Sequence, residues 1–322
     1  MSELGLAVSC SVSAPNDGVP PNIEGLFDQI GDWEWLRLDS DVRGRIAFAI
    51  HQRLLARYLT SGMRVLEIGA GPGRFTIALA QLGCRVVVSD VSSVQLALNE
   101  EHVNAAGVAD SIEDRVQLDV RDLSRFGDGS FDALVAYGGP LSYVFEDAAQ
   151  ALRECFRVTR AQGPVLASVM SLAGSGRYFV ESFLPTIEVV GLDTFRAFLD
   201  DGDQRTLASV PGTHPCRLFT WDQVQDLVAQ AGGEVLAGLA SNWLSLGPDP
   251  ILRQFEESEE LWNTLLEWEE RFCAEQGAID GGTHILFAAR APAGREVVGA
   301  ASVTEVVTGE ARPANSRDAN IT

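Results

Sequence analysis

The sequence predicts an α/β fold of the doubly wound type, with a mostly parallel seven-stranded sheet between two layers of helices. Two observations predict it. Short apolar runs typical of buried strands alternate with segments in which apolar residues recur at helical spacing. Glycine, proline and aspartate gather between the two kinds of segment and indicate turns. Because parallel neighbours need a crossover connection, this alternation favours a parallel sheet with helices on both faces.

The strands are expected where the apolar runs lie, at residues 65–68, 85–89, 116–118, 133–137, 165–170, 235–240 and 283–289. The three-valine run that precedes Asp90 is typical of a strand buried on both faces. Helices are expected at residues 26–59, 74–82, 92–103, 146–159, 178–190, 192–199, 220–232 and 252–272. Thr220 and Gln223 form a capping-box pattern, which marks the start of one of these helices.

Length and composition limit the class of protein. A chain of 322 residues with 46% hydrophobic residues can bury one large core, so one principal domain with additions is expected. A formal net charge of -21 and the lack of a Lys/Arg cluster argue against a nucleic-acid partner. Five scattered cysteines without a C-x-x-C pair predict neither a zinc site nor a disulfide framework. We therefore expect a cytoplasmic monomer or homodimer with no metal, signal peptide or membrane partner.

Changes in composition divide the chain into six expected parts. The two ends, residues 1–22 and 291–322, lack periodicity and are expected to be disordered. Residues 171–219 interrupt the alternation of strand and helix, and they predict an inserted helical lid over the substrate region. The other parts are an N-terminal helical cap at residues 23–60, a cofactor-binding core at 61–170, and the rest of the sheet with an acidic helix at 220–290.

A glycine-rich turn is the candidate cofactor-binding element of the core. The apolar run Val65–Ile68 ends at Gly69, Gly71 and Gly73, and helical spacing begins at Arg74. Glycines let a ligand lie directly on the backbone at a helix N-terminus. A dinucleotide fingerprint has its third glycine where Arg74 stands here. By itself this pattern has three interpretations. It can bind a nucleotide-like cofactor, it can belong to a dehydrogenase, or it can be a strand-to-helix turn with a purely structural role.

Polar residues follow the next two strands. Asp90 ends the second strand and is placed to accept both hydroxyls of a ribose, with a charge interaction at the following helix N-terminus as the alternative. Asp119 follows the third strand and can accept the exocyclic amine of adenine, while the Val120 backbone amide can donate to a ring nitrogen. Asp122 is its neighbour but lies farther from the strand end. These residues predict the binding of a nucleoside.

Four segments resemble, in order and spacing, the cofactor-binding motifs of class I S-adenosylmethionine-dependent methyltransferases: VLEIGAGPGRF, VVVSDVS, VQLDVRDLSRFGDGSFDALVAYGG and ALRECFRVTRAQGPVLAS. The resemblance covers about residues 61–170. It implies that the cofactor is S-adenosylmethionine and the product S-adenosylhomocysteine. It also implies the residues that hold the cofactor, with Ala70 and Val91 beside them. Glu67 supports the methionine amino group through water or the backbone. The other contacts are Gly69, Gly71 and Gly73 at the methionine part, Asp90 at the ribose, Asp119 and Val120 at the adenine, and the Tyr137 carbonyl at the methionyl amine near the sulfonium.

The acceptor decides whether a base is needed. A hydroxyl or an ammonium must lose a proton, whereas a carboxylate does not. His214 lies in a loop expected to return to the carboxyl edge of the sheet, so it is the candidate base, and Tyr143 and Tyr178 are further candidates. The other histidines are expected to be structural, because His51 and His102 lie in predicted helices away from that edge and His284 opens the last strand.

Aromatic and basic residues supply candidate substrate contacts. Trp33 or Trp35 can form one wall of the pocket, or can pack the cap onto the core. Arg177 or Arg217 can hold an anionic substrate, or can form surface charge pairs. All four are candidates without an assigned contact.

The sequence thus predicts a methyltransferase acting on an oxygen or nitrogen, less favourably a carbon, of a small or medium-sized molecule, with specialised metabolism as its setting. One alternative is a methyltransferase acting on a protein or a ribosomally made peptide. Another is a scaffold that binds S-adenosylmethionine without transferring its methyl group. A dehydrogenase is disfavoured, because Arg74 occupies the third glycine position.

Overall fold

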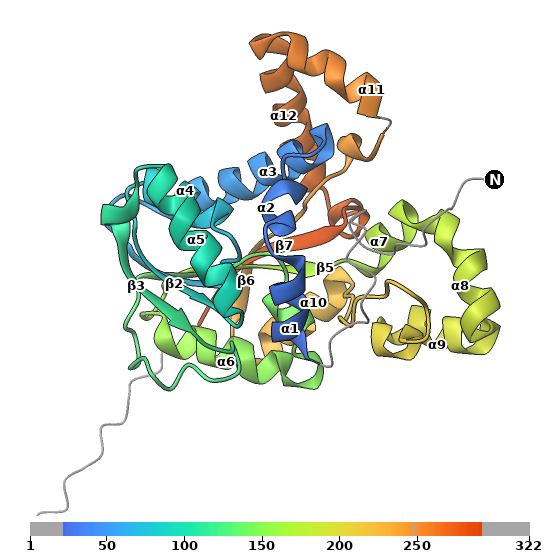
Figure 1. The fold of residues 1–322 in the computed structure, drawn as a ribbon, viewed down its shortest axis with the longest axis horizontal. Coiled ribbons are helices and arrows are strands. Elements are labelled where there is room, and N and C mark those ends of the chain that lie inside the picture. The colour runs from blue at the N-terminus through green and yellow to red at the C-terminus, as the bar shows by residue number, and fades with distance from the viewer. Residues whose placement is uncertain (1–21, 248, 292–322) are drawn as a thin grey trace, which may run out of the picture.

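The structure is a computed structural model that describes residues 22–247 and 249–291. The two ends were expected to be disordered. Apart from Asn22 and Ala291, their residues lie outside the described range. Within it, seven strands form one sheet with helices around it (Figure 1).

The sheet has the order β3-β2-β1-β4-β5-β7-β6. Its strands are β1 (Arg64–Ile68), β2 (Arg85–Asp90), β3 (Ile112–Gln117), β4 (Ala133–Ala136), β5 (Val165–Met170), β6 (Glu234–Ala240) and β7 (His284–Arg290). Strands β1 to β5 are parallel, and β7 is antiparallel to both neighbours. The predicted doubly wound sheet is confirmed. Strand β3 starts four residues earlier than expected, because it is an edge strand whose exposed Glu113 and Asp114 interrupt the apolar pattern.

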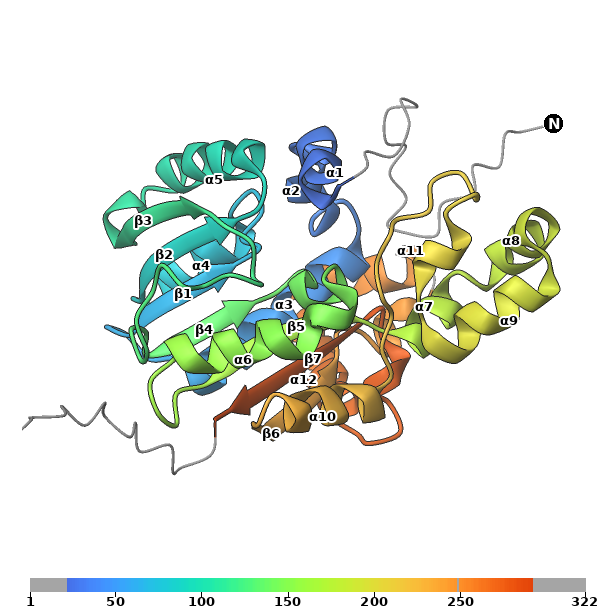
Figure 2. The ribbon, with the colours of Figure 1, turned by 90° about the horizontal axis from the view of Figure 1, so that it is seen from below.

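The sheet is covered on both faces by helices. Alternate residues of the central strands enter two separate clusters, so that Leu66 packs on one face and Val65 on the other. One face is covered by α6 (Ala148–Val158) and α10 (Trp221–Gln230), which lie in front of the sheet in Figure 2. The other face is covered by α3 (Val42–Tyr58), α4 (Arg74–Gln81) and α12 (Glu259–Cys273), and α5 (Ser93–Ala105) packs at the side of β2 and β3.

The N-terminal part contains three helices where one long helix was expected. They are α1 (Ile23–Ile30), α2 (Trp33–Arg37) and α3 (Val42–Tyr58). Gly31, with a φ of 55°, ends α1, and the Asp41 side chain caps α3 by accepting from the Gly44 backbone amide at 2.7 Å. The first two helices lie apart from the layers in Figure 2, and we refer to α1 and α2 as the roof helices.

The insertion after β5 contains α7 (Leu172–Tyr178), α8 (Phe183–Val190) and α9 (Leu192–Asp201). The expected helix at 178–190 corresponds to a short 3-10 turn at Val180–Ser182 followed by α8, and α7 precedes it. These helices pack around an apolar cluster of their own that includes Phe195, Phe198 and Leu218. They stand beside the sheet in Figure 1. We refer to α7, α8 and α9 together as the lid.

The expected acidic helix at 252–272 is also divided. It consists of α11 (Asp249–Leu252), a 3-10 turn and α12 (Glu259–Cys273), because Ser258 is extended and its hydroxyl accepts from the Leu261 backbone amide at 3.0 Å. Among the described residues, no helix has the length and apolar content that crossing a membrane requires.

Candidate active site

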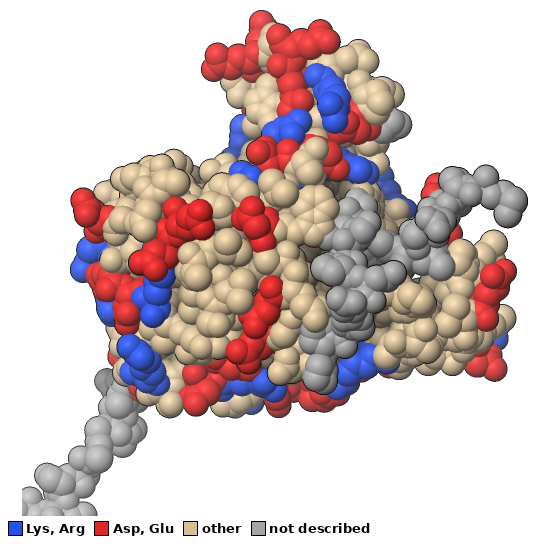
Figure 3. Space-filling model, in the orientation of Figure 1, with Lys and Arg blue, Asp and Glu red and all other residues tan. Residues whose placement is uncertain are grey.

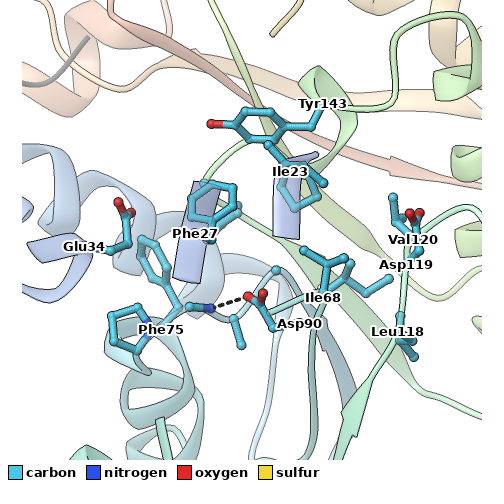
Figure 4. A pocket seen from close by; sticks show the side chains of 18 of the residues that line it. Ile23, Phe27, Glu34, Ile68, Phe75, Asp90, Leu118, Asp119, Val120 and Tyr143 are labelled. Carbon is cyan, nitrogen blue, oxygen red and sulfur yellow. Dashed lines mark hydrogen bonds between the residues drawn. The ribbon is translucent and has the colours of Figure 1, made fainter. Parts of the chain in front are cut away.

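A pocket lies where the first four strands end. Its floor consists of residues at or just after the ends of these strands: Ile68, Gly69, Ala70 and Gly71 at the end of β1, Asp90 and Val91 at the end of β2, Leu118, Asp119 and Val120 after β3, and Tyr137 and Gly138 after β4. The roof helices close it from above with Ile23, Phe27, Glu34 and Arg37. Figure 4 shows Phe27 and Tyr143 on one side of the pocket and Asp90 and Ile68 on the other. Carboxyl ends of parallel strands are the usual ligand site of such sheets.

The glycine turn brings backbone N–H groups to this floor. Gly69, Gly71 and Gly73 all have positive φ angles, of 64°, 53° and 103°. A Cβ at position 69 would lie 2.6 Å from the Pro140 ring, so the turn and the segment after β4 can approach only because glycine stands there. Gly73 caps α4 behind the pocket and is not among the residues that line it.

Asp90 joins the glycine turn to the next helix. Its Oδ2 accepts from the Gly71 backbone amide at 2.8 Å, and its Oδ1 accepts from the Ser92 backbone amide at 2.9 Å. The first of these bonds is drawn in Figure 4. Burial raises the pKa of Asp90 to about 6, against the effect of both hydrogen bonds. The carboxylate at the ribose position expected from the sequence is therefore held in a fixed orientation on the pocket floor.

Glu67 lies beneath the turn instead of in the pocket. Its side chain is buried, and its Oε2 accepts from the Thr76 hydroxyl at 2.6 Å. Burial, together with the nearby Asp90 carboxylate, raises its pKa to about 8, against the effect of the Thr76 hydrogen bond. This placement supports the turn from below, so any role toward the cofactor amino group is indirect.

The difference in free energy of unfolding between Glu67→Gln and the wild-type chain is expected to change in favour of the variant as the pH rises. In the unfolded chain Glu67 loses its proton near its ordinary pKa of 4.5, whereas in the folded chain it keeps the proton up to about pH 8. The contribution of Glu67 to stability is therefore complete below pH 4.5 and is lost as the pH rises to 8, at about 1.4 kcal/mol per pKa unit. Chemical denaturation of both proteins at pH 5 and pH 9 measures this. A difference that is the same at both pH values would contradict the assignment.

The expected adenine position is also on the floor. Leu118, Asp119 and Val120 line the pocket after β3. Burial raises the pKa of Asp119, but hydrogen bonds from Arg121 outweigh it and leave the pKa below its ordinary value, with the closest contact at 2.6 Å. The alternative Asp122 is exposed and caps the Ser124 backbone amide at 3.0 Å.

Tyr137 lines the pocket at the end of β4. Its ring is buried against His51 and Phe75, with ring centroids 4.8 and 5.1 Å away. Burial raises the pKa of the Tyr137 phenol and lowers that of His51 to about 4. His51 was expected to lie away from the carboxyl edge. The structure places it directly behind the pocket wall instead, because α3 packs over the end of β4.

Tyr143 and His214 form a hydrogen-bonded pair at the pocket. The Tyr143 hydroxyl lies 2.7 Å from His214 Nε2, although the two residues are 71 positions apart. Tyr143 follows the 3-10 turn after β4 and lines the pocket, and His214 comes from the loop between the lid and α10. The Phe27 ring packs edge-on against Tyr143, with ring centroids 5.5 Å apart. Burial lowers the pKa of His214 to about 4, so its imidazole is neutral at pH 7 and can accept a proton.

Sequence reasoning did not find Glu34 and Arg37. Both line the pocket from α2, and Arg37 Nε donates to Glu34 Oε1 at 3.0 Å. Their spacing of three residues places them on one face of a helix, which is the one feature that could have indicated them. A positive and a negative side chain are thus paired at the roof of an otherwise mostly apolar pocket.

The two tryptophans proposed for the pocket wall do not line it. The Trp35 ring stacks on His102 at 3.9 Å between centroids, and the Arg74 guanidinium lies 4.1 Å over the same ring. Helix α2 turns Glu34 and Arg37 toward the pocket, so Trp33 and Trp35 fall on its other sides. The aromatic wall is Phe27, and the tryptophan positions agree with the packing alternative.

The remaining candidates lie outside the pocket. Tyr178 ends α7, where the Arg43 guanidinium lies 5.0 Å from its ring. The Arg177 guanidinium lies 5.0 Å over the Trp243 ring. Arg217 belongs to a short bridge at the base of the lid. The lid therefore does not direct these three side chains to the pocket floor.

The pocket presents the groups that S-adenosylmethionine requires. The backbone of the glycine turn, the Asp90 carboxylate and the edge after β3 follow one another along the strand ends, as a nucleoside joined to an amino acid needs. The side chain of Gln95, fully buried beside Gly71, has an amide oxygen with no partner among the described residues. No group of three or more His, Cys, Asp or Glu side chains in the described chain is placed to hold a metal ion.

Comparison with known proteins agrees with this geometry. A family profile described as "Methyltransferase domain" matches residues 65–163. The tRNA 5-carboxymethoxyuridine methyltransferase of Escherichia coli K12 is 24% identical over 277 residues, which are 84% of this chain and 98% of that protein. The ubiquinone biosynthesis O-methyltransferase of Pseudomonas aeruginosa UCBPP-PA14 is 29% identical over 146 residues, or 43% of this chain and 59% of that protein.

The fold is also shared with solved structures. The [4+2]-cyclase SpnF superposes with a TM-score of 0.51 at 17% identity, covering 86% of this chain and all of that one. At this identity the likeness concerns the fold alone. The profile match, the sheet order and the pocket floor together account for the motifs that the sequence displays.

Proposed function

Because this chain is a class I S-adenosylmethionine-dependent methyltransferase, we propose that it methylates a hydroxyl or amine of a small or medium-sized organic molecule. The observation that carries this proposal is the Tyr143–His214 pair at the pocket. A neutral imidazole bonded to a phenol can remove a proton from an acceptor, and only a hydroxyl or an ammonium acceptor needs this.

S-adenosylmethionine, when bound, supplies a methyl group activated by a sulfonium. The chain itself would hold and orient the reactants, which is where such an enzyme obtains most of its rate. The glycine turn and Asp90 would hold the amino-acid and ribose parts, and Asp119 the adenine. The Tyr143 hydroxyl would take the acceptor proton while its own proton moves to His214 Nε2.

The walls favour an acceptor with much apolar surface. Ile23, Phe27, Leu38 and Val144 line the pocket beside the Tyr143 hydroxyl. Such a wall excludes water from the acceptor and strengthens the hydrogen bond of the Tyr143–His214 pair. An aromatic or alicyclic hydroxyl compound fits this description, and specialised metabolism is the setting in which we place it.

Charge argues against a polyanionic acceptor. The chain contains no lysine, and all 24 of its basic residues are arginines. Many of the described arginines are already paired with carboxylates, as Arg53 and Arg57 are with Glu270. On the face that carries the roof helices, basic side chains are interspersed with acidic ones and form no continuous patch (Figure 3). Phosphate backbones are bound by such patches.

A second candidate is methylation of a carboxyl group on a tRNA nucleoside. It is favoured by the similarity of nearly the whole chain to a tRNA 5-carboxymethoxyuridine methyltransferase. A carboxylate acceptor would need no base, so the Tyr143–His214 pair would then only position the substrate. This difference makes the two candidates separable by experiment.

Incubation with methyl-labelled S-adenosylmethionine and fractionated bacterial extract tests the proposal. Label is expected in the small-molecule fraction, where mass spectrometry then identifies the acceptor. Label in the RNA fraction that RNase removes would support the second candidate instead. Label on protein or peptide would favour the remaining alternative, and the absence of any S-adenosylhomocysteine would contradict methyl transfer.

A further inference from the structure

The roof helices are held mainly by polar contacts. Helix α1 buries one residue, Leu26, and α2 buries none, whereas α3 buries six. A segment with so little buried apolar surface separates from the core at low free-energy cost. Whether α1 stays over the pocket therefore depends on a few hydrogen bonds.

Those hydrogen bonds come from the first turn of α5. Gln95 Nε2 donates to the carbonyl oxygens of Phe27 at 2.9 Å and Gly31 at 3.0 Å. The Ser92 hydroxyl donates to Asp28 Oδ1 at 2.5 Å, and the Ser92 backbone amide donates to Asp90. The segment that carries the predicted ribose contact is thus the same segment that holds α1.

The other end of the Gln95 side chain has no partner among the described residues. Its Oε1 is completely buried and lies 3.9 Å from where a Cβ of Gly71 would be, beside the pocket floor. A buried acceptor without a donor is unfavourable. Without a ligand, holding α1 in place therefore leaves one polar atom unsatisfied, and a hydroxyl or ammonium donor arriving at Gly71 would satisfy it.

Helix α1 in turn contacts the proton-transfer pair. The Phe27 ring lies 5.5 Å from the Tyr143 ring and 6.1 Å from the His214 ring, both edge-on. With α1 in this position the cavity is about 110 Å³, below the roughly 300–1,000 Å³ of ordinary small-molecule sites. Ile23 and Phe27 of α1 form part of the cavity wall, so an outward movement of α1 enlarges the cavity and its return places Phe27 against Tyr143.

We propose that Gln95 is a positioning residue that couples cofactor binding to closure of α1 over the acceptor site. Its amide nitrogen holds α1, its amide oxygen takes a hydrogen bond from the bound cofactor, and α1 sets Phe27 against the Tyr143–His214 pair. The cofactor then binds before the acceptor. This inference rests on the proposed use of the pocket, but its test needs no acceptor.

Hydrogen–deuterium exchange of residues 23–31, with and without S-adenosylhomocysteine, tests the coupling. In the wild-type chain the ligand is expected to slow exchange about tenfold, as one additional satisfied hydrogen bond implies. In Gln95→Leu the exchange is expected to be fast with or without ligand, and affinity by calorimetry is expected to fall about tenfold. The matched control is Asn104→Leu, an exposed amide on the same helix, which should behave as wild type.

Asp28→Ala provides a second variant from the roof side, in case Gln95→Leu does not fold. It should speed exchange of residues 23–31 in the unliganded chain and leave the melting temperature nearly unchanged. Two results would overturn the coupling. One is an exchange rate of α1 in the wild-type chain that does not change when the ligand binds, and the other is an exchange rate that is the same in both variants as in the wild-type chain. Failure of the wild-type chain to bind S-adenosylhomocysteine at all would instead contradict the proposed function.

Discussion

Tyr143→Phe is expected to lower kcat by about a hundred- to ten-thousand-fold with little change in S-adenosylmethionine affinity, since one positioned proton-transfer group contributes about that much. The substitution removes the hydroxyl 2.7 Å from His214 Nε2 but keeps the ring that packs against Phe27. Steady-state rates with the acceptor found by labelling, at saturating cofactor, measure the first effect. Calorimetry measures the second.

Tyr58→Phe is the matched control, because Tyr58 ends α3 and does not line the pocket. The pH dependence gives an independent check. Burial holds the pKa of His214 near 4, so the acid limb of kcat/KM should lie near pH 4 instead of 6.5. Wild-type rates for Tyr143→Phe would exclude proton transfer through this pair and would favour a carboxylate acceptor.

Asp90→Ala is expected to weaken S-adenosylmethionine binding about ten- to a hundredfold, or about 1.5–3 kcal/mol for hydrogen bonds to a charged group. Two losses combine here. The ribose hydroxyls would lose their acceptor, and the Gly71 backbone amide would lose the contact that fixes the glycine turn. Calorimetry with S-adenosylhomocysteine, which cannot react, measures the change.

The wild-type affinity should also depend on pH. Burial raises the pKa of Asp90 to about 6, so the carboxylate becomes protonated as the pH falls below 6, and affinity should fall with it. The variant should lack this dependence. Asp122→Ala is the control. Asp122 is an exposed residue that follows β3, so this variant should bind the ligand as the wild-type chain does. Equal affinity of Asp90→Ala and wild type would exclude Asp90 from the ribose site.

The fold and the floor of the pocket could be predicted because they depend on short stretches of sequence. Each apolar run formed a strand, and Gly69, Asp90 and Asp119 each lie at or within two residues of the end of one of these strands. Parallel strands bring their carboxyl ends to one edge, so residues far apart in sequence meet there without further information. The helix breaks at Gly31 and Ser258 were missed, because a single glycine or serine does not interrupt helical spacing decisively.

The acceptor side of the pocket was predicted only in part. Tyr143 and His214 were both candidates, but nothing in the sequence joined them. Trp33 or Trp35 was a candidate for the wall, with packing onto the core as the alternative, and Phe27, Glu34 and Arg37 stand at the wall. These residues come from a loop, a 3-10 turn and two short helices, whose orientation is set by packing against the rest of the molecule and not by local periodicity.

The sequence by itself determined the seven strands of the sheet and the candidate cofactor residues near their ends, because each follows from backbone geometry over a few neighbouring residues. Only the tertiary structure decided which side chains form the roof and which residue pairs with His214. It also decided that the Gln95 amide connects the roof to the floor. Such contacts depend on how separate elements are rotated against one another, and a rotation of one short helix exchanges the residues that face the pocket.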